Sequence, residues 1–244
     1  SSVVLNIRAR EEQRDLIDSA AQKLGKNRSE FMLEASCRQA ESVLLDQTYF
    51  HLDTEAFEEF QRKLDEPPEA NEPLQALLGR KPSPKPIRPE HDVSDFDCGH
   101  EALNFWLKER ALGNHSRGGS RVYVVCESGK VAGYYCLAAG GVGHSHVSAA
   151  LRKNSPDPLP VLVLGRLAVD KSFAGAGLGL DLVRDAMLRT LQVAELAGVV
   201  GLLVHAIDEQ ARGFWVRKCG FATSPVHPLT LYLSVKTIRK NLTP

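Results

Sequence analysis

Hydrophobic and polar positions follow a helical period in the first 45 residues, after a short alternating stretch. Alternation over residues 3–8 predicts a strand with Val3, Leu5 and Ile7 on one face. Two amphipathic helices should follow, one over residues 11–24 and one capped by Ser29. A unit of about 45 residues buries too little apolar surface to be stable alone. We therefore expect it to form a homodimer or higher oligomer through its strand.

The next segment, residues 46–83, combines aromatic and acidic residues. A capped helix is predicted from Thr54 with Phe57 and Phe60 on its apolar face, and Pro67 and Pro68 should end it. Residues 71–78 predict one more apolar turn. The proline-rich stretch 79–92 is typical of an extended linker, which places a domain boundary near residue 83. We expect this segment to lie across another surface, either masking a site or only adding apolar core.

Beyond residue 84, segments with the hydrophobic period of a helix are mixed with segments that have the period of a strand. Helices are predicted over residues 101–112, 180–196 and 209–218, and strands over residues 121–127, 131–142, 161–169, 199–207 and 229–235. Strands interleaved with helices indicate a mixed α+β domain. The sequence thus predicts three parts, residues 1–45, 46–83 and 84–244.

Charged residues are also unevenly distributed along the chain. The formal net charge of the 244 residues is zero. Residues 46–73 nevertheless carry nine acidic and two basic side chains, whereas residues 74–244 carry an excess of seven basic ones. The acidic segment is either a solvated helix or a mask over a basic surface that binds a polyanion.

The composition also indicates which cellular compartment to expect and whether a metal site is expected. No apolar run reaches the length of a membrane span, and no signal peptide is visible. Five cysteines without a C-x-x-C pair argue against disulfides and zinc, so we expect a reducing cytoplasm. His144 and His146 resemble a metal pair, but they lack a third ligand, and we expect no metal site.

The stretch VLGRLAVDKSFAGAGLG, residues 163–179, carries the strongest chemical signal. A strand runs into a turn with Gly175, Gly177 and Gly179, and a long helix follows. Glycine allows backbone conformations that a Cβ blocks, and amide groups at a helix N-terminus bind phosphate. The turn predicts a cradle for a phosphate-bearing cofactor.

Five motifs in the C-terminal part support a family resemblance. LGRLAVD, AGAGLG and ARGFWVRKCGF resemble the GNAT acetyltransferase superfamily, and FDCGHEALNFWLKERA with SPVHPLTLYLSVK is similar to its TacT-type toxins. In the N-terminal part, LNIRA, GKNRSEFMLEA, LLDQTYFHLD and LQALL resemble TacA-type ribbon–helix–helix antitoxins. The resemblance implies an antitoxin followed by a toxin on one polypeptide.

That resemblance implies an activity and its cofactor. TacT-type toxins transfer acetyl from acetyl-CoA to the α-amine of aminoacyl-tRNA, which blocks translation. In this chain the backbone of Leu167, Ala168 and Val169 would bind the pantetheine arm. The diphosphate would lie on the turn formed by Ala174, Gly175, Ala176, Gly177, Leu178 and Gly179.

Two departures from the family pattern affect this expectation. Ala174 and Ala176 stand where the family usually has polar or basic residues, so a side-chain contribution to phosphate binding is lost. Trp215 stands where the family usually has a catalytic tyrosine, and an indole is only a donor. Water or Tyr232 would then supply the proton, and we expect activity to be impaired or unconventional.

Nucleic-acid contacts complete the expected sites. Arg117, Arg121 and Arg166 are candidates for tRNA binding around the acceptor cleft. The ribbon–helix–helix resemblance implies operator DNA as a partner, with Asn6 and Arg8 facing base edges. The residues expected to hold DNA phosphates are Arg10, Lys26 and Arg28.

Two other functions fit the same residues. One is an N-acetyltransferase of proteins or small molecules that carries a dimerisation module. The other is a DNA-binding repressor whose acetyltransferase domain senses acetyl-CoA without transferring acetyl. Acetyl transfer to tRNA, with and without the acidic segment, separates the three.

Overall fold

The computed structural model describes residues 6–78, 84–144, 158–225 and 227–242. The chain forms two compact units, residues 1–43 and 44–244. Residues 44–78, which precede the acetyltransferase-like part within the second unit, are called the docked segment below.

The first unit consists of two helices with little buried surface. Helix α1 spans Glu11–Lys23, and α2 spans Arg28–Leu45. The predicted cap Ser29 is wrong: Asn27 caps α2, because its Oδ1 accepts a hydrogen bond from the Glu30 amide at 2.9 Å. Residues 6–10 form no strand, and the rest of the predicted strand lies outside the described residues.

The side chains of this unit leave its apolar surface exposed. Among described residues 6–43 only Ala21 is buried, and Leu16 is 72% exposed. Leu24 and Leu33 are exposed as well. The described residues of this unit thus form almost no core of their own, and that a second copy covers them stays a prediction.

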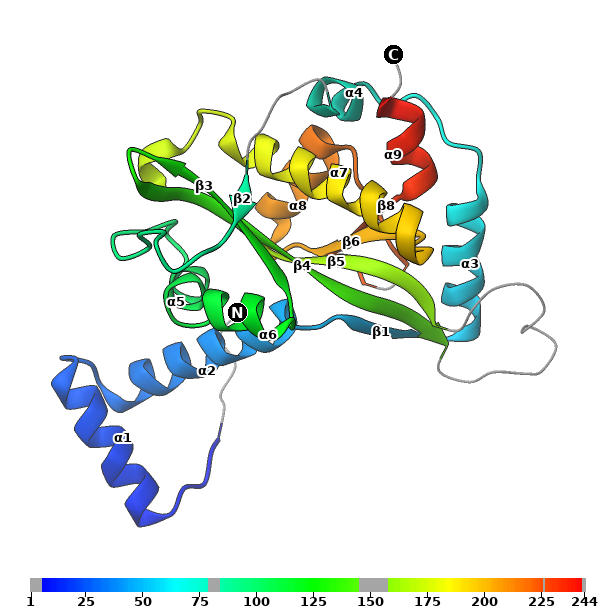
Figure 1. Cartoon of the computed structure of the whole chain (residues 1–244). Coiled ribbons are helices and arrows are strands. Elements are labelled where there is room, and N and C mark those ends of the chain that lie inside the picture. The colour runs from blue at the N-terminus through cyan, green and yellow to red at the C-terminus, as the bar shows by residue number, and fades with distance from the viewer. Residues whose placement is uncertain (1–5, 79–83, 145–157, 226, 243–244) are drawn as a thin grey trace. The chain divides into compact units, whose positions relative to one another are not determined.

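The second unit is built on one mixed sheet, in the order β2-β3-β4-β5-β6-β8-β7 (Figure 1). The strand bounds are β2 Lys85–Pro86, β3 Arg121–Glu127, β4 Lys130–His144, β5 Leu159–Val169, β6 Gly201–His205, β7 Ala222–Thr223 and β8 Thr230–Ser234. The pairs are antiparallel except β5 with β6, and β1 (Tyr49–Leu52), which joins β4 in parallel. These findings confirm the mixed α+β fold.

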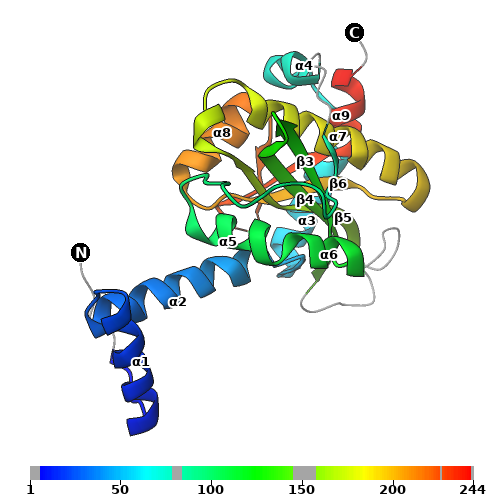
Figure 2. The same cartoon turned by 60° about the vertical axis from the view of Figure 1, so that its left-hand side comes forward.

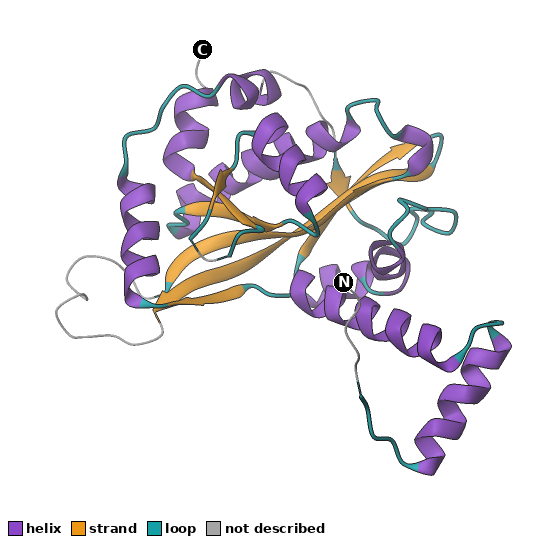
Figure 3. Ribbon diagram, turned by 180° about the vertical axis from the view of Figure 1, so that it is seen from behind, coloured by secondary structure: helices purple, strands orange, loops and turns teal. Residues whose placement is uncertain are grey.

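One face of the sheet holds the larger core. It is covered by α4 (Glu72–Leu78), α7 (Leu178–Ala197), α8 (Glu209–Cys219) and α9 (Val235–Leu242), as Figure 3 shows from behind. Leu182, Met187, Leu202 and Ile238 are fully buried here. Helix α4 belongs to the docked segment, so that segment contributes directly to this core.

The other face is covered in two halves (Figure 2). Helices α5 (Glu101–Glu109) and α6 (Ala111–Arg117) pack on the β3 side of the sheet. Helix α3 (Thr54–Asp65) packs over β4, β5 and β6 with Phe57, Phe60 and Leu64 buried, and β1, at the edge of β4, adds buried side chains to the same cluster. The docked segment therefore supplies half of this face.

Several elements differ from the sequence prediction, which also lacked the two-residue strands β2 and β7. The helix expected over residues 101–112 breaks at Arg110, whose backbone (φ −121°, ψ −31°) closes α5 and opens α6. Strand β1 and helix α9 were not predicted. Both depend on neighbours distant in sequence: β1 on the free edge of β4, and α9 on the α7 face.

Candidate active site

A gap between β5 and β6 forms the centre of the site. The two strands pair only through residues 162–164 and 202–204, after which their pairing ends. The register on the β4 side shifts between Cys136 and Leu137, which leaves Gly165 as the extra residue of a bulge. Leu167, Ala168 and Val169 then pair with β4 only, so their other backbone edge faces the gap. This is the strand edge expected to bind a pantetheine arm.

The glycine-rich turn lies at the end of β5. Gly175 and Gly177 have φ angles of 81° and 83°, in the left-handed region that favours glycine. Gly179 is helical, and a Cβ there would make only ordinary contacts, at 3.7 Å. Gly177 is the N-cap of α7, so Leu178 and Gly179 present amides at the start of a 20-residue helix. The turn fits a diphosphate through main-chain amides, because Ala174 and Ala176 add no charge.

Beside the turn and the gap lies a cleft of about 410 Å³, called the large cleft below. It has an apolar wall and a few polar groups. Its lining includes the α5 end (Cys98, His100, Leu103), the β5 edge (Leu167, Ala168, Val169), Gly179, and the α8 region (Ile207, Asp208, Gln210, Ala211, Phe214, Trp215). No described residue of the docked segment lines it.

A second hollow of about 70 Å³, the small cavity, adjoins the large cleft. Its wall includes Leu45, Arg166, His205 and Trp215. Trp215 lines both hollows and is buried between Phe214 and Phe221, with ring centroids 5.3 Å away in each case. It therefore stands at the junction of the two hollows, where a donor and an acceptor would meet.

The structure corrects the role suggested for Tyr232. Along β8, Leu231 and Leu233 face the α7 side, whereas Tyr232 faces α3 and meets Phe60 edge-on at 5.4 Å. Tyr232 lines neither the large cleft nor the small cavity. Alternation along the strand turns it away from the cleft, and burial raises its pKa, so it is not placed to supply a proton.

The three arginines chosen for tRNA do not come together. Arg166 is buried at the small cavity, where its Nη1 donates to Asp46 Oδ1 at 2.7 Å. Arg121 is exposed at the start of β3, in register with Leu137, and alternation puts it on the opposite face from Arg166. Arg117 is exposed at the end of α6. Only Arg166 belongs to the site.

Two functional candidates were missed from the sequence. The first is His205, which ends the apolar strand β6 and lies in the wall of the small cavity, with Nδ1 3.0 Å from Thr230 Oγ1. Burial and the nearby His227 lower its pKa, so its imidazole is neutral at pH 7. A polar residue ending an apolar strand was the available signal.

Asp97 is the second missed residue. Its carboxylate accepts hydrogen bonds from Lys171 Nζ (2.9 Å), Asn104 Nδ2 and the Gly99 amide (both 2.8 Å). These bonds, led by the one from Lys171, hold the pKa of Asp97 far below its usual value. The network ties the loop that carries Cys98 and His100 to the turn after β5, and so fixes two walls of the large cleft.

The predicted DNA-binding residues lie in the first unit. Asn6 and Arg8 are exposed, and Arg10 is the N-cap of α1. Lys26, in the turn before α2, pairs with Glu34 of that helix, and Arg28 of α2 pairs with Asp18 of α1.

Metal ligands and membrane spans were considered only for the part of the chain that the structure describes. The described residues contain no group of three metal-ligating side chains, and His146 lies outside them. Of the helices that the structure describes, none is both long and apolar enough to cross a membrane.

The docked segment is held on the sheet edge by a close fit. The carbonyl of Thr48 accepts a hydrogen bond from the Gly141 amide at 3.0 Å. A Cβ on Gly140 would lie 2.3 Å from that carbonyl oxygen, so glycine is required for this approach. Asn71 adds a hydrogen bond from Nδ2 to the Gly220 carbonyl at 3.1 Å.

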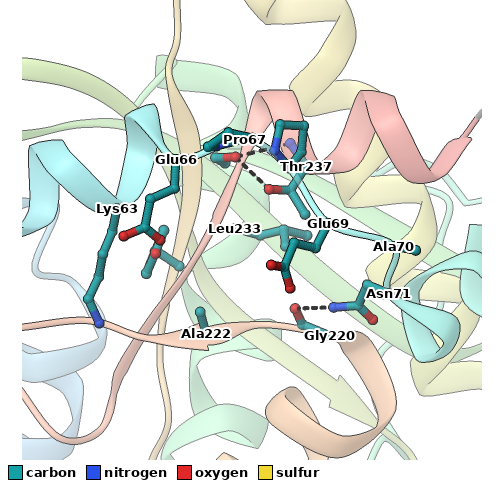
Figure 4. Close-up of a pocket in the computed structure, with 13 residues that line it drawn as sticks. Lys63, Glu66, Pro67, Glu69, Ala70, Asn71, Gly220, Ala222, Leu233 and Thr237 are labelled. Atoms are coloured by element: carbon teal, nitrogen blue, oxygen red, sulfur yellow. Dashed lines mark hydrogen bonds between the residues drawn. The ribbon is translucent and has the colours of Figure 1, made fainter.

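A third hollow, of about 520 Å³, lies between the end of α3 with residues 66–71, the β7–β8 region and α9. Figure 4 shows Lys63, Glu66 and Glu69 of the docked segment, and Gly220, Leu233 and Thr237 of the GNAT-like part, around this hollow. Its lining contains neither Trp215 nor the glycine turn, so it is separate from the active site.

Residues 85–221, more than half of the chain, match the model of the acetyltransferase (GNAT) family. The chain belongs to the GNAT acetyltransferase family. A tRNA-acetylating toxin of Mycobacterium tuberculosis is 45% identical over 157 residues, which cover 64% of this chain and 94% of that protein. The resemblance of this GNAT part to toxins is therefore confirmed.

The N-terminal part has its own relatives. Residues 4–83 match the model described as antitoxin TacA 1-like. Antitoxin TacA1 of Salmonella typhimurium is 48% identical over 82 residues, or 34% of this chain and 86% of that protein. The GNAT part is thus joined, on one chain, to a member of the TacA antitoxin family.

Two solved structures are similar to about two thirds of this chain. The structure described as AtaTR bound with AcCoA has a TM-score of 0.60 and 30% identity, covering 66% of this chain and 98% of that one. The KacTA–DNA complex has a TM-score of 0.54 and 30% identity, with 66% and 98% covered.

Proposed function

We propose that this protein is a toxin–antitoxin fusion. Its GNAT part transfers acetyl from acetyl-CoA to the α-amine of aminoacyl-tRNA, which blocks translation. Its TacA part neutralises that activity and represses by binding operator DNA. The tRNA-acetylating relative and the acetyl-CoA and DNA complexes of similar proteins support these substrates and partners.

The large cleft is suited to acetyl-CoA. The amides around Gly175, Gly177, Leu178 and Gly179 would hold the diphosphate, and the edge of Leu167–Val169 would hold the pantetheine arm. Acetyl-CoA supplies the acetyl group as a thioester. Without basic side chains at Ala174 and Ala176, the phosphate site depends on amides alone, so we expect a reduced affinity.

The small cavity is suited to the acceptor amine. Trp215 lines both this cavity and the large cleft, and its indole N–H can act there only as a hydrogen-bond donor. The neutral imidazole of His205 is the base within this wall that is available to an α-ammonium group at neutral pH.

One observation carries the proposal for neutralisation. Leu45 lines the small cavity, whereas no described residue of the docked segment lines the large cleft. The antitoxin part therefore closes the acceptor side and leaves the cofactor side open. We expect the full-length chain to bind acetyl-CoA and to be inert toward aminoacyl-tRNA.

Radiolabelled acetyl transfer tests the reaction. Full-length protein and the variant Phe60→Ala/Leu64→Ala, which loosens α3, are each incubated with labelled acetyl-CoA and total aminoacyl-tRNA. Label in tRNA from the loosened variant only is the expected result. Turnover without RNA would favour a protein or small-molecule acetyltransferase, and acetyl-CoA-dependent operator binding without transfer would favour a sensing repressor.

The functional division that we propose follows residues 1–45, 46–83 and 84–244. Exposed Leu16, Leu24 and Leu33 support dimerisation of the first part, and Asn6 and Arg8 are free of secondary structure that would hide them. Leu33→Glu should convert the oligomer to monomer in sedimentation and abolish operator binding. Five cysteines without a disulfide fit action in the cytoplasm, where aminoacyl-tRNA is found.

A further inference from the structure

Arg166 is a cation in an unusual position. It lies on β5 at the wall of the small cavity with its side chain only 3% exposed, and its guanidinium lies 4.5 Å from the Trp106 ring centroid. It forms an ion pair with Asp46, at 2.7 Å. Burying a charge without a counter-charge is strongly unfavourable. Arg166 therefore requires an anion at this point.

Asp46 supplies that anion from the solvent side. Its side chain is 60% exposed, so the ion pair joins a buried arginine to a carboxylate at the surface. Leu45 is buried in the adjoining wall, and a Cβ on Gly165 would lie 3.2 Å from the Leu45 carbonyl oxygen. Leu45 thus forms part of the wall of the small cavity, and the neighbouring Asp46 carboxylate lies at a position that is accessible from outside.

We infer that Arg166 is the phosphate-binding residue of the acceptor site and that Asp46 imitates the acceptor's phosphate in the full-length chain. The inference rests on the proposed function for the identity of the acceptor. In an aminoacyl ester the carboxyl group is esterified and carries no charge, so the anion offered by aminoacyl-tRNA is a phosphodiester near its 3′ end. The planar guanidinium matches phosphate as it matches carboxylate.

Binding of deacylated tRNA to the full-length protein, at one fixed ionic strength, tests this inference without depending on catalysis. Asp46→Asn keeps the shape and a hydrogen-bond acceptor but removes the charge. Asp65→Asn is the matched control, because it removes another carboxylate of the docked segment, which pairs with Lys236 at 3.0 Å away from the small cavity. Arg166→Gln and Arg166→Lys are combined with Asp46→Asn, and circular dichroism verifies that each variant folds.

Asp46→Asn should bind tRNA about tenfold more tightly than the unchanged protein, the scale of one charge-assisted hydrogen bond. Asp65→Asn should stay at the unchanged level. Adding Arg166→Gln should cancel the gain, whereas Arg166→Lys should keep part of it, because the charge remains but the planar fork is lost. If the variant with Arg166→Gln fails to fold, the variant with Arg166→Lys tests the inference instead, because it should lose part of the gain in tRNA affinity.

Equal gains for Asp46→Asn and Asp65→Asn, no gain at all, or a gain that survives both Arg166 variants would overturn the inference. AMP and inorganic phosphate serve as competitors: competition by both indicates a general phosphate site, and competition by AMP alone indicates recognition of a terminal nucleotide, each in keeping with a phosphate-binding Arg166. A variant that binds tRNA through Arg166 but transfers no acetyl to charged tRNA would leave the inference standing and contradict the proposed reaction.

Discussion

The large cleft and the small cavity share Trp215 but differ in what covers them. The large cleft is walled by elements of the GNAT part, whereas the small cavity includes Leu45 from the docked segment. Helix α3 and strand β1 continue that cover along the same face of the sheet. An antitoxin that covers one side only blocks the second substrate while the first can still bind.

Loosening the docked segment should have the largest effect on the difference between the covered small cavity and the open large cleft. Phe60 is fully buried, and Phe60→Ala should weaken docking by about 3–5 kcal/mol. We expect acetylation of aminoacyl-tRNA to rise at least about a hundredfold, with an unchanged acetyl-CoA affinity by calorimetry. Phe105→Ala, at an exposed phenylalanine of α5, is the control and should not activate the enzyme. A change in acetyl-CoA affinity instead would show that the cover reaches both hollows.

The next effect concerns the cofactor side. Ala176 is exposed beside the turn, and Ala176→Arg should add a charge-assisted bond to phosphate. We expect acetyl-CoA affinity to rise by about ten- to a hundredfold. Ala176→Gln has no charge and should gain much less. Calorimetry that shows no gain for the arginine variant would mean that this side chain does not reach the diphosphate.

Strain in the turn should give a smaller loss. Gly177→Val forces a β-branched residue into a left-handed conformation at a cost of about 1–2 kcal/mol. Acetyl-CoA affinity should fall by about five- to thirtyfold. Gly198→Val imposes similar strain at the other end of α7, where φ is 66°, and should leave the affinity unchanged. Equal losses in the two variants would point to general destabilisation.

The smallest expected effect is on the pH dependence of stability, through His205 in the wall of the small cavity. The pKa of folded His205 is lowered by burial, so the unfolded chain binds more protons just below pH 6.5. The contribution of neutral His205 to the free energy of unfolding is therefore present above pH 6.5 and is lost as the pH falls below it. The melting temperature of the unchanged protein should therefore fall a little more between pH 7 and pH 5 than that of His205→Gln. His51→Gln, at an exposed histidine, should behave like the unchanged protein.

The glycine turn and most helices and strands were predictable because their signals are local. Alternation revealed β3, β4 and β5, and the positive φ angles at Gly175 and Gly177 follow from residue type. Strand β1 was not predictable, because four residues of mixed polarity become a strand only beside the free edge of β4.

The site was predictable only in part for the same reason. The β5 edge and the turn follow one another in sequence, so they were found together. The contact of Asp46 with Arg166 joins residues 120 positions apart, and no local pattern reveals it. Tyr232 was misplaced because the composition of β8 does not state which of its faces meets the cleft, and that choice is made by its pairing with β6.

The pairing of β1 with β4 takes place within one polypeptide. The effective concentration of β1 at the edge of β4 is therefore set by the covalent connection and not by how much protein a cell contains. Dilution leaves such a strand in place, and an excess of one component over the other cannot arise. Release then requires either cleavage of the backbone or a binding event strong enough to peel the strand from the sheet.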